Sequence, residues 1–219
     1  MNATHIYHLI YKDILLEWRQ KYAFNGIILY VFSTLFIINI SFKKVQPDAW
    51  ITLFWIVILF ASVNAGAKSF IQDGKSKLLY YYTLASPESI LLSKFVYNCL
   101  LLILLGFITL AGFALLFGNV IENMGFFALI VLLGSIGFAA TFTMISAIAS
   151  KAKGSATLMT ILSFPVILPQ LLLLNKLSRF AAQGFELLAV GNKELFSLMA
   201  INLIVVIISY LLFPYLWRE

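Results

Sequence analysis

Six long apolar segments account for most of this chain, and each approaches the roughly 20 apolar residues that cross a bilayer as a helix. A water-soluble domain could not bury them, because the chain is 62% hydrophobic and only 11% charged. We therefore expect an all-α membrane protein in which residues 1–219 form a single transmembrane domain. The six predicted transmembrane helices lie at about 22–42, 49–67, 95–117, 125–150, 155–175 and 195–217.

The positive charges predict which ends of these helices face the cytoplasm. With six spans both termini lie on one side, and 10 of the 15 lysines and arginines fall on that side. Cytoplasmic loops are enriched in these residues, so both termini are predicted to be cytoplasmic. The same enrichment explains the net charge of +6, and we expect no nucleic acid partner. The ten residues are Lys12, Arg19, Lys21, Lys68, Lys75, Lys77, Lys94, Lys151, Lys153 and Arg218.

Two further segments are predicted to be helical without crossing the membrane. Residues at about 5–20 mix apolar and charged side chains, which is typical of an interfacial helix lying along the cytoplasmic face. Residues at about 176–193 are too polar and too short to cross. We expect them to form an outer-face or re-entrant helical loop, where protein or water satisfies the backbone.

The stretch "LLYYYTLASPESILLSK" between the second and third spans contains a marked helix start. Ser86 suits the N-cap, because its hydroxyl can accept a hydrogen bond from a first-turn amide. Pro87 suits the first helical position, and Glu88 favours the positive end of the helix dipole. We expect a short, separate cytoplasmic helix at about 86–94 on which a partner docks. The alternative is a capped extension of the third span.

The stretch "QDGKS" just before this helix ends like a phosphate-binding loop. That motif requires a glycine five residues before its second glycine, and Ser69 stands in that position. We therefore expect no nucleotide site and no enzymatic activity in this chain. If ATP drives it, a separate subunit must hydrolyse the ATP.

Three motifs follow one another along the chain: "KDILLEWR" before the first span, "FIQDGKSKLLYYYTLASPESILLSK" after the second, and the proline pair of "FPVILPQLLL". Together with the size and the six-span layout, they resemble the haem exporter protein B family (CcmB). That family supplies the membrane subunit of the ABC-type complex for cytochrome c maturation. The resemblance implies a location in the bacterial inner (cytoplasmic) membrane.

The resemblance also implies partners. Two copies of the chain would pair with two copies of a cytoplasmic ABC ATPase subunit, beside a haem-handling membrane subunit and its small partner. The helix at about 86–94 would be a coupling helix seated in a groove of the ATPase, and the helix at about 5–20 would be an elbow beside it. The residues implied to contact the ATPase are Ser86, Pro87, Glu88, Ser89, Glu17 and Arg19. For Glu17 and Arg19 the alternative is a solvated helix end, with Arg19 reaching lipid phosphate.

Pro165 and Pro169 lie four residues apart in the fifth span, and each removes one backbone hydrogen bond. They form either a hinge or a break that exposes carbonyls to a pathway, or a static kink relieved by neighbouring helices. We favour the static kink, which is common in membrane helices.

Other span residues are expected to pack rather than to act. The small residues between 134 and 140 predict a close approach of helices. Asn64 and Asn98 could line a path, but hydrogen-bonded packing is the favoured interpretation. Trp50 is expected at the outer membrane interface, as amphipathic rings prefer.

No cofactor is assigned to the chain. Both histidines, His5 and His8, precede the first span, so no span offers the histidine that haem iron often takes as an axial ligand. Cys99, Met144 or Met159 are weaker substitutes. Haem is expected at most as a transient substrate, and ATP belongs to the partner subunit.

Two functions remain open. In the first, the chain relays ATP-driven motion to the haem-handling subunit and so releases a haem-loaded chaperone on the outer face. In the second, it is a permease that exports haem or another amphiphile. Charges within spans usually mark ion or proton routes, and none is evident here. Their scarcity favours the relay and disfavours a proton-coupled transporter.

Overall fold

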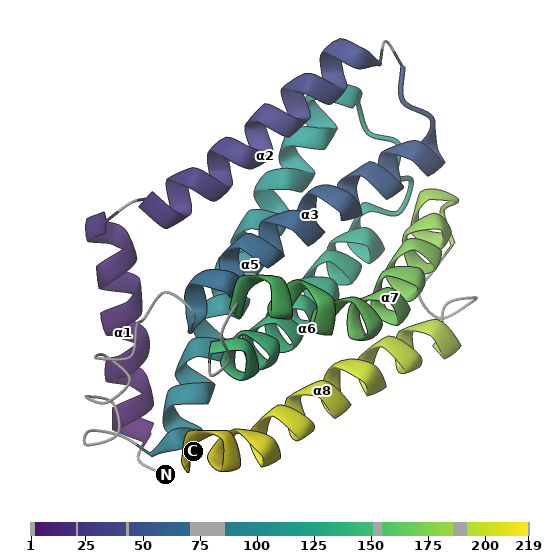
Figure 1. The fold of residues 1–219 in the computed structure, drawn as a ribbon. Coiled ribbons are helices and arrows are strands. Elements are labelled where there is room, and N and C mark those ends of the chain that lie inside the picture. Colours follow the sequence, from purple (N-terminus) through teal and green to yellow (C-terminus); the bar gives the residue numbers. More distant parts are fainter. Residues whose placement is uncertain are drawn as a thin grey trace.

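A computed structural model of the chain describes residues 3–20, 22–42, 44–70, 86–150, 155–185 and 192–218. Within these residues all regular secondary structure is α-helical, which confirms the predicted all-α class. The helices, labelled as in Figure 1, are α1 (Ala3–Gln20), α2 (Tyr22–Ser41), α3 (Pro47–Ser69), α5 (Pro87–Phe117), α6 (Met124–Ser150), α7 (Ser155–Ala182) and α8 (Asn192–Arg218).

Five of these helices are long and apolar enough to cross a membrane, so the chain is a multi-pass membrane protein. The first predicted span corresponds to α2, whose described apolar part is the shorter stretch Asn25–Ser41. That stretch rises about 26 Å, slightly less than the roughly 30 Å of a bilayer core. Five of the six predicted spans are thus confirmed as helices that can cross a membrane, and the first stays a prediction. The five apolar stretches are Pro47–Ala67, Pro87–Phe117, Met124–Ser150, Thr157–Ala182 and Asn192–Tyr215.

Two predicted boundaries differ from the structure. Residues 86–94 do not form a separate helix, because α5 continues from Pro87 to Phe117 without a break. No glycine or proline interrupts the chain between residues 88 and 105, so nothing ends the helix there. The predicted outer loop at 176–193 is also shorter. Its first seven residues belong to α7, while residues 186–191 lie outside the described part of the chain.

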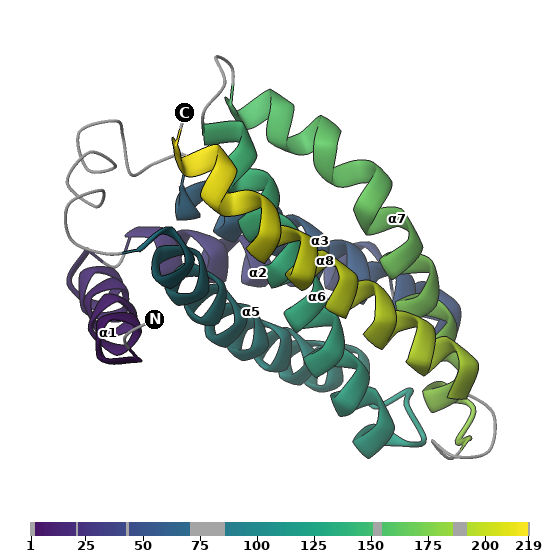
Figure 2. The same ribbon diagram turned by 90° about the horizontal axis from the view of Figure 1, so that it is seen from below.

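Helix α6 is the centre of the bundle and contacts α3, α5, α7 and α8. Of its apolar stretch, 67% is buried, against 28% for α7 and 22% for α8. Figures 1 and 2 show α2 to α8 running roughly along one direction, whereas α1 points elsewhere and lies outside the bundle at one end. The faces of α7 and α8 that point away from α6 are therefore available to lipid or to other subunits.

Trp50 lies in the first turn of α3, but its ring does not face the membrane surface; its depth in the bilayer stays a prediction. The indole is 0% exposed and lies in an aromatic cluster where α3, α5 and α6 meet. Its ring centroid is 5.6 Å from that of Phe54, 5.0 Å from that of Phe113 and 5.7 Å from that of Phe127. Among the described residues its Nε1 has no hydrogen-bond partner, so burial of the ring outweighs the preference of the N–H for water.

The small residues of α6 are placed where neighbouring helices come closest. A Cβ added at Gly134 would lie 2.7 Å from Cη2 of Trp55, and one added at Gly137 would meet the side-chain amide of Asn202. Only glycine fits at these two contacts. The predicted packing role of these residues is confirmed.

Candidate functional site at the end that carries both termini

Both termini lie at the same end of the molecule, where α1 lies beside the start of α5 (Figure 1). An apolar cluster brings the helices together there. Phe70 at the end of α3 packs on Phe213 of α8 with 5.6 Å between ring centroids. Ile90 and Leu91 of α5 and Ala147 of α6 complete the cluster, and Leu9 of α1 packs against it. The start of α5 is thus held against four other helices.

A buried ion pair joins α1 to α5 beside this cluster. Nζ of Lys94 lies 3.6 Å from Oδ2 of Asp13, and the two side chains are 9% and 8% exposed. Lys12, whose side chain is 35% exposed, places its Nζ 3.2 Å from the other oxygen of the same carboxylate. A buried charge deprived of its opposite partner is strongly destabilising. The pair therefore favours the arrangement in which α1 stays against the first turns of α5.

The sequence motifs contained both residues of this pair, but we did not single them out. A usable signal was present. Asp13 follows Leu9 by four residues, so the two lie on the same face of α1. A carboxylate on the apolar face of a helix needs a buried partner, and Lys94 is the lysine that α5 carries near its start.

The helix start at Ser86 is where the sequence predicts it, but the cap differs. Ser86 has the extended backbone of an N-cap and Pro87 occupies the first turn. The Ser86 hydroxyl does not bond to a first-turn amide; it lies 2.9 Å from the hydroxyl of Ser89. Ser89 is only 2% exposed, so its hydroxyl needs a partner within the protein, and Ser86 supplies it. The backbone carbonyl of Ser86 accepts bonds from the amides of Ser89 and Ile90.

Asn98, one turn beyond Lys94, has the hydrogen-bonded packing role that we predicted. Its Nδ2 donates to Oγ1 of Thr143 at 2.7 Å and to Oγ of Ser69 at 3.2 Å, and so joins α5 to α6 and α3. Asn64 is exposed, and its Nδ2 donates to the carbonyl of Phe60 one turn earlier, at 3.0 Å.

The other predicted site residues do not gather here into one constellation. Arg19 is exposed near the end of α1, and the side chain of Glu17 lies outside the described part of the structure. Pro165 and Pro169 lie inside α7, which continues through both, and both are exposed on the outside of the bundle. Their role as a hinge or a static kink stays a prediction.

Gln170, next to the second proline, is a buried polar residue that we did not predict from the sequence. Nε2 of Gln170 in α7 lies 3.2 Å from Oγ1 of Thr141 in α6 and 3.5 Å from Oδ1 of Asn202 in α8. Nδ2 of Asn202 donates to the carbonyl of Leu133 at 3.0 Å. This polar triad of Thr141, Gln170 and Asn202 joins the central helix to the two least buried ones. A glutamine inside an apolar run was the available signal.

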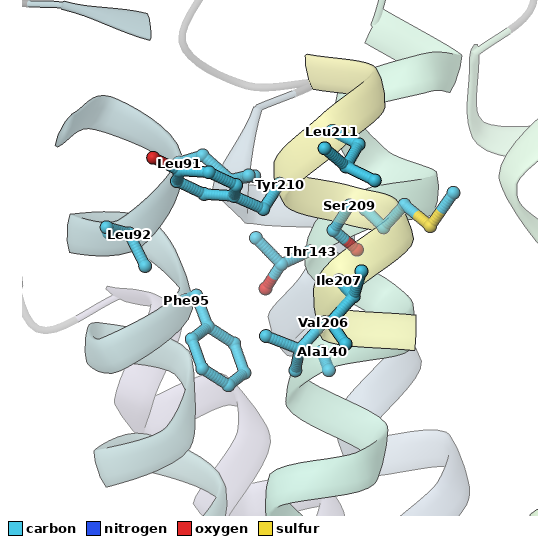
Figure 3. Close-up of a pocket in the computed structure, with 11 residues that line it drawn as sticks. Leu91, Leu92, Phe95, Ala140, Thr143, Val206, Ile207, Ser209, Tyr210 and Leu211 are labelled. Carbon is cyan, nitrogen blue, oxygen red and sulfur yellow. The ribbon is translucent and has the colours of Figure 1, made fainter. Parts of the chain in front are cut away.

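An apolar groove of about 220 Å³ opens near the same end, between α5 and α8. Figure 3 shows Leu91, Leu92 and Phe95 of α5 on one side and residues of α8, among them Leu211, on the other, with the side chain of Tyr210 reaching from α8 toward Leu91. The polar atoms in its wall have partners, since Oγ of Ser209 donates to the carbonyl of Val205 at 2.6 Å. The groove thus presents mainly apolar surface, which suits an apolar segment of a partner.

In the described ranges, no group of three His, Cys, Asp or Glu side chains is placed to hold a metal ion. The three weaker haem ligands named from the sequence have different surroundings. Cys99 is half-buried in α5, Met144 lines the groove of Figure 3, and Met159 is 1% exposed where it packs near Gly66.

A family model described as CcmB protein matches residues 4–215 of the chain. The chain belongs to the CcmB family. Membership makes it a membrane component of an ABC-type system for haem export and cytochrome c maturation, as the three motifs implied. No individual curated protein matches the sequence. The matched range of this CcmB chain runs from α1 into α8, so it includes both Asp13 and Lys94.

Proposed function

We propose that this CcmB chain couples ATP hydrolysis by a separate cytoplasmic ABC ATPase subunit to haem handling, or to release of a haem-loaded chaperone, on the outer face. The proposal puts both termini in the cytoplasm of a bacterial cell, since the segments predicted to lie on the side of the termini carry 10 of the 15 lysines and arginines. The observation that carries it is the buried pair of Asp13 and Lys94. That pair joins two of the segments that the proposed topology exposes to a cytoplasmic protein.

The length of α5 supports this access. Its 31 residues rise about 46 Å, whereas the hydrocarbon core is about 30 Å thick. The excess of about 16 Å corresponds to roughly the first ten residues, if the C-terminal end stops at the opposite boundary. Coupling therefore needs no separate helix. The protruding first turns of α5 can receive a push from the ATPase and carry it directly into the membrane.

The proposed ATPase-binding surface contains fewer residues than the six named from the resemblance. Ser86 is exposed, Pro87 and Glu88 are half-buried, and Arg19 is exposed on α1. Ser89 is 2% exposed and so holds Ser86 in place rather than contacting a partner. Glu17 stays in the proposed surface only because the family resemblance implies it.

The outward face of α1 fits the elbow role. Tyr7, Tyr11 and Ile14 are 66%, 54% and 43% exposed, although α1 carries several charges. Apolar and aromatic side chains of this kind are stable at the boundary between lipid headgroups and acyl chains. An elbow helix that rests in this boundary can move with the ATPase and still remain joined to α5.

The proposed assembly contains a second copy of the chain, the ABC ATPase, the haem-handling membrane subunit and its small partner. The weakly buried helices α7 and α8 supply apolar surface for such contacts. ATP is bound by the ATPase, and haem passes at most transiently over this chain. The chain itself has no enzymatic role in this proposal.

The relay is favoured over the permease by the pairing of the buried polar side chains. Gln170, Thr141 and Asn202 bond to one another, and Asn98 bonds to Thr143 and Ser69. A path for an anionic amphiphile needs polar groups that turn toward a lumen. These groups instead join helices inside one protomer, as a unit that transmits motion requires.

Reconstitution tests the choice between relay and permease. When vesicles contain the chain and the ATPase but lack the haem-handling subunit, we expect no ATP-dependent transfer of haem across the bilayer. When all subunits are present, release of the haem-loaded chaperone should depend on ATP. Transfer of haem by the smaller assembly would establish the permease instead.

Changing Ser86-Pro87-Glu88 to three alanines tests the coupling surface. We expect binding of the ATPase to weaken by about tenfold or more, because a helix start and a charge are lost at the contact. Insertion into the membrane should not change. The matched control is Gln46-Pro47-Asp48 changed to alanines, a helix start of the same kind at the opposite end. Equal binding by both variants and the unchanged chain would remove this surface from the proposal.

A further inference from the structure

A second groove, of about 450 Å³, lies between α3 and α7 toward the end opposite the termini. Its wall on α7 changes character along the helix. Leu168 and Leu172 come first, followed by Asn175, Lys176 and Arg179, and their spacing puts them on one helix face. From Leu168 to Arg179 the helix rises about 16 Å. The groove is therefore apolar in its inner part and cationic at its rim.

The wall on α3 changes in the same direction. Leu59 and Ile56 line the apolar part of the groove, and Thr52 lies nearer the rim. Nδ2 of Asn175 is 3.4 Å from Oγ1 of Thr52, so the two polar zones face each other. Trp55 between them donates its Nε1 proton to Oγ of Ser178 at 2.9 Å, which leaves carbon atoms of the ring toward the groove. Both walls thus match a ligand with an apolar tail and a polar head.

The rim carries positive charge that is accessible to a ligand. Lys176 and Arg179 are 55% and 51% exposed, and both line the groove. Glu194 contacts Lys176 at 2.6 Å and Asp48 contacts Nε of Arg179 at 3.2 Å, but neither carboxylate lines the groove. Exposed ion pairs contribute little stability, and a guanidinium has five N–H donors, so both cations can also bind a phosphate.

We propose that an anionic phospholipid of the outer leaflet occupies this groove. Its acyl chain lies along Ile56, Leu59 and Leu172, and its phosphate and headgroup lie at Lys176 and Arg179. An anionic headgroup competes with Glu194 and Asp48 for these two cations better than a zwitterionic one does, because the charge of its phosphate is not compensated by a cation of its own. A second copy of this chain is a poorer occupant, since its apolar helix face would have to cover both cations.

Lipid retention by the assembled complex tests the site. The complex is placed in phosphatidylcholine nanodiscs with a minor fraction of phosphatidylglycerol, and retained lipids are counted by native mass spectrometry. We expect preferential retention of phosphatidylglycerol. The double substitution K176Q/R179Q should reduce the preference by about fivefold per cation removed, which corresponds to about 1 kcal/mol each. The substitution L172W, which fills the apolar part, should reduce retention of both lipids.

The matched control is K44Q/K193Q, which removes two exposed cations at the same end but outside the groove. It should leave the preference unchanged. Equal retention of both lipids by the unchanged complex would overturn the proposal. So would an equal loss in the control, which would show only a general attraction to charge. Retention of no lipid together with cross-linking of two copies across Leu172 would assign the groove to a dimer contact instead.

Discussion

Replacing Lys94 by methionine is expected to destabilise the protein by about 3–5 kcal/mol, because Asp13 is left as a buried carboxylate with only half-exposed Lys12 beside it. Asp13→Leu should also destabilise the protein, since it removes the carboxylate that lies beside the buried ammonium of Lys94. The measurement is unfolding of the purified chain by SDS titration in mixed micelles.

The double variant D13L/K94M separates the charges from the packing. Well-packed apolar side chains can replace a buried ion pair at little cost, so we expect the double variant to lie within about 1 kcal/mol of the unchanged protein. Lys12→Met is the matched control, because it removes a partially exposed charge from the same carboxylate and should cost less than about 1 kcal/mol. If the two single changes add up in the double variant, the two residues do not interact.

The same variants test coupling when they are studied in the complex. For each single variant we expect the yield of mature c-type cytochrome per assembled complex to fall while the ATPase remains bound, because α1 no longer moves with α5. The double variant should recover much of the yield. A fall that follows only the amount of folded protein would reduce the pair to a structural role.

Replacing Gly137 by valine is also expected to lower the stability of the protein strongly. A Cβ at this position would meet the side-chain amide of Asn202, which donates to the carbonyl of Leu133 and faces Gln170. Overpacking costs about 1–3 kcal/mol, and each hydrogen bond lost within a membrane bundle adds about 0.6–2 kcal/mol. We expect a loss of about 2–4 kcal/mol in the same unfolding assay.

Gly125→Val is the control for this change. Gly125 lies in the same helix, and a Cβ there would lie 3.8 Å from Oδ1 of Asn123, an ordinary contact. It should cost only about 0.5 kcal/mol or less. Adding Asn202→Ala to Gly137→Val makes room for the new side chain and should recover part of the loss. A Gly137 variant as stable as the Gly125 variant would show that α6 and α8 are not packed as described.

Some of the candidate site could be predicted and some could not, for reasons that differ from residue to residue. The helix start at Ser86 was predicted correctly, because capping depends on a few adjacent residues. The bond made by its hydroxyl was not, because it depends on the burial of Ser89 by other helices. Lys176 and Arg179 suggested a loop after the fifth span, yet α7 continues to Ala182. The helix can hold these two charges because both side chains lie at the exposed rim of the groove.

The sequence by itself determined that this is an all-helical membrane protein, where most of its helices begin and end, and which end bears the excess positive charge. Those properties depend on runs of neighbouring residues and on the fixed thickness of a bilayer. Only the tertiary structure decided that Asp13 meets Lys94, that Gln170 meets Thr141 and Asn202, and that the ring of Trp50 is buried in an aromatic core. Each of these contacts joins different helices, and their rotation and register follow from how all the side chains pack together.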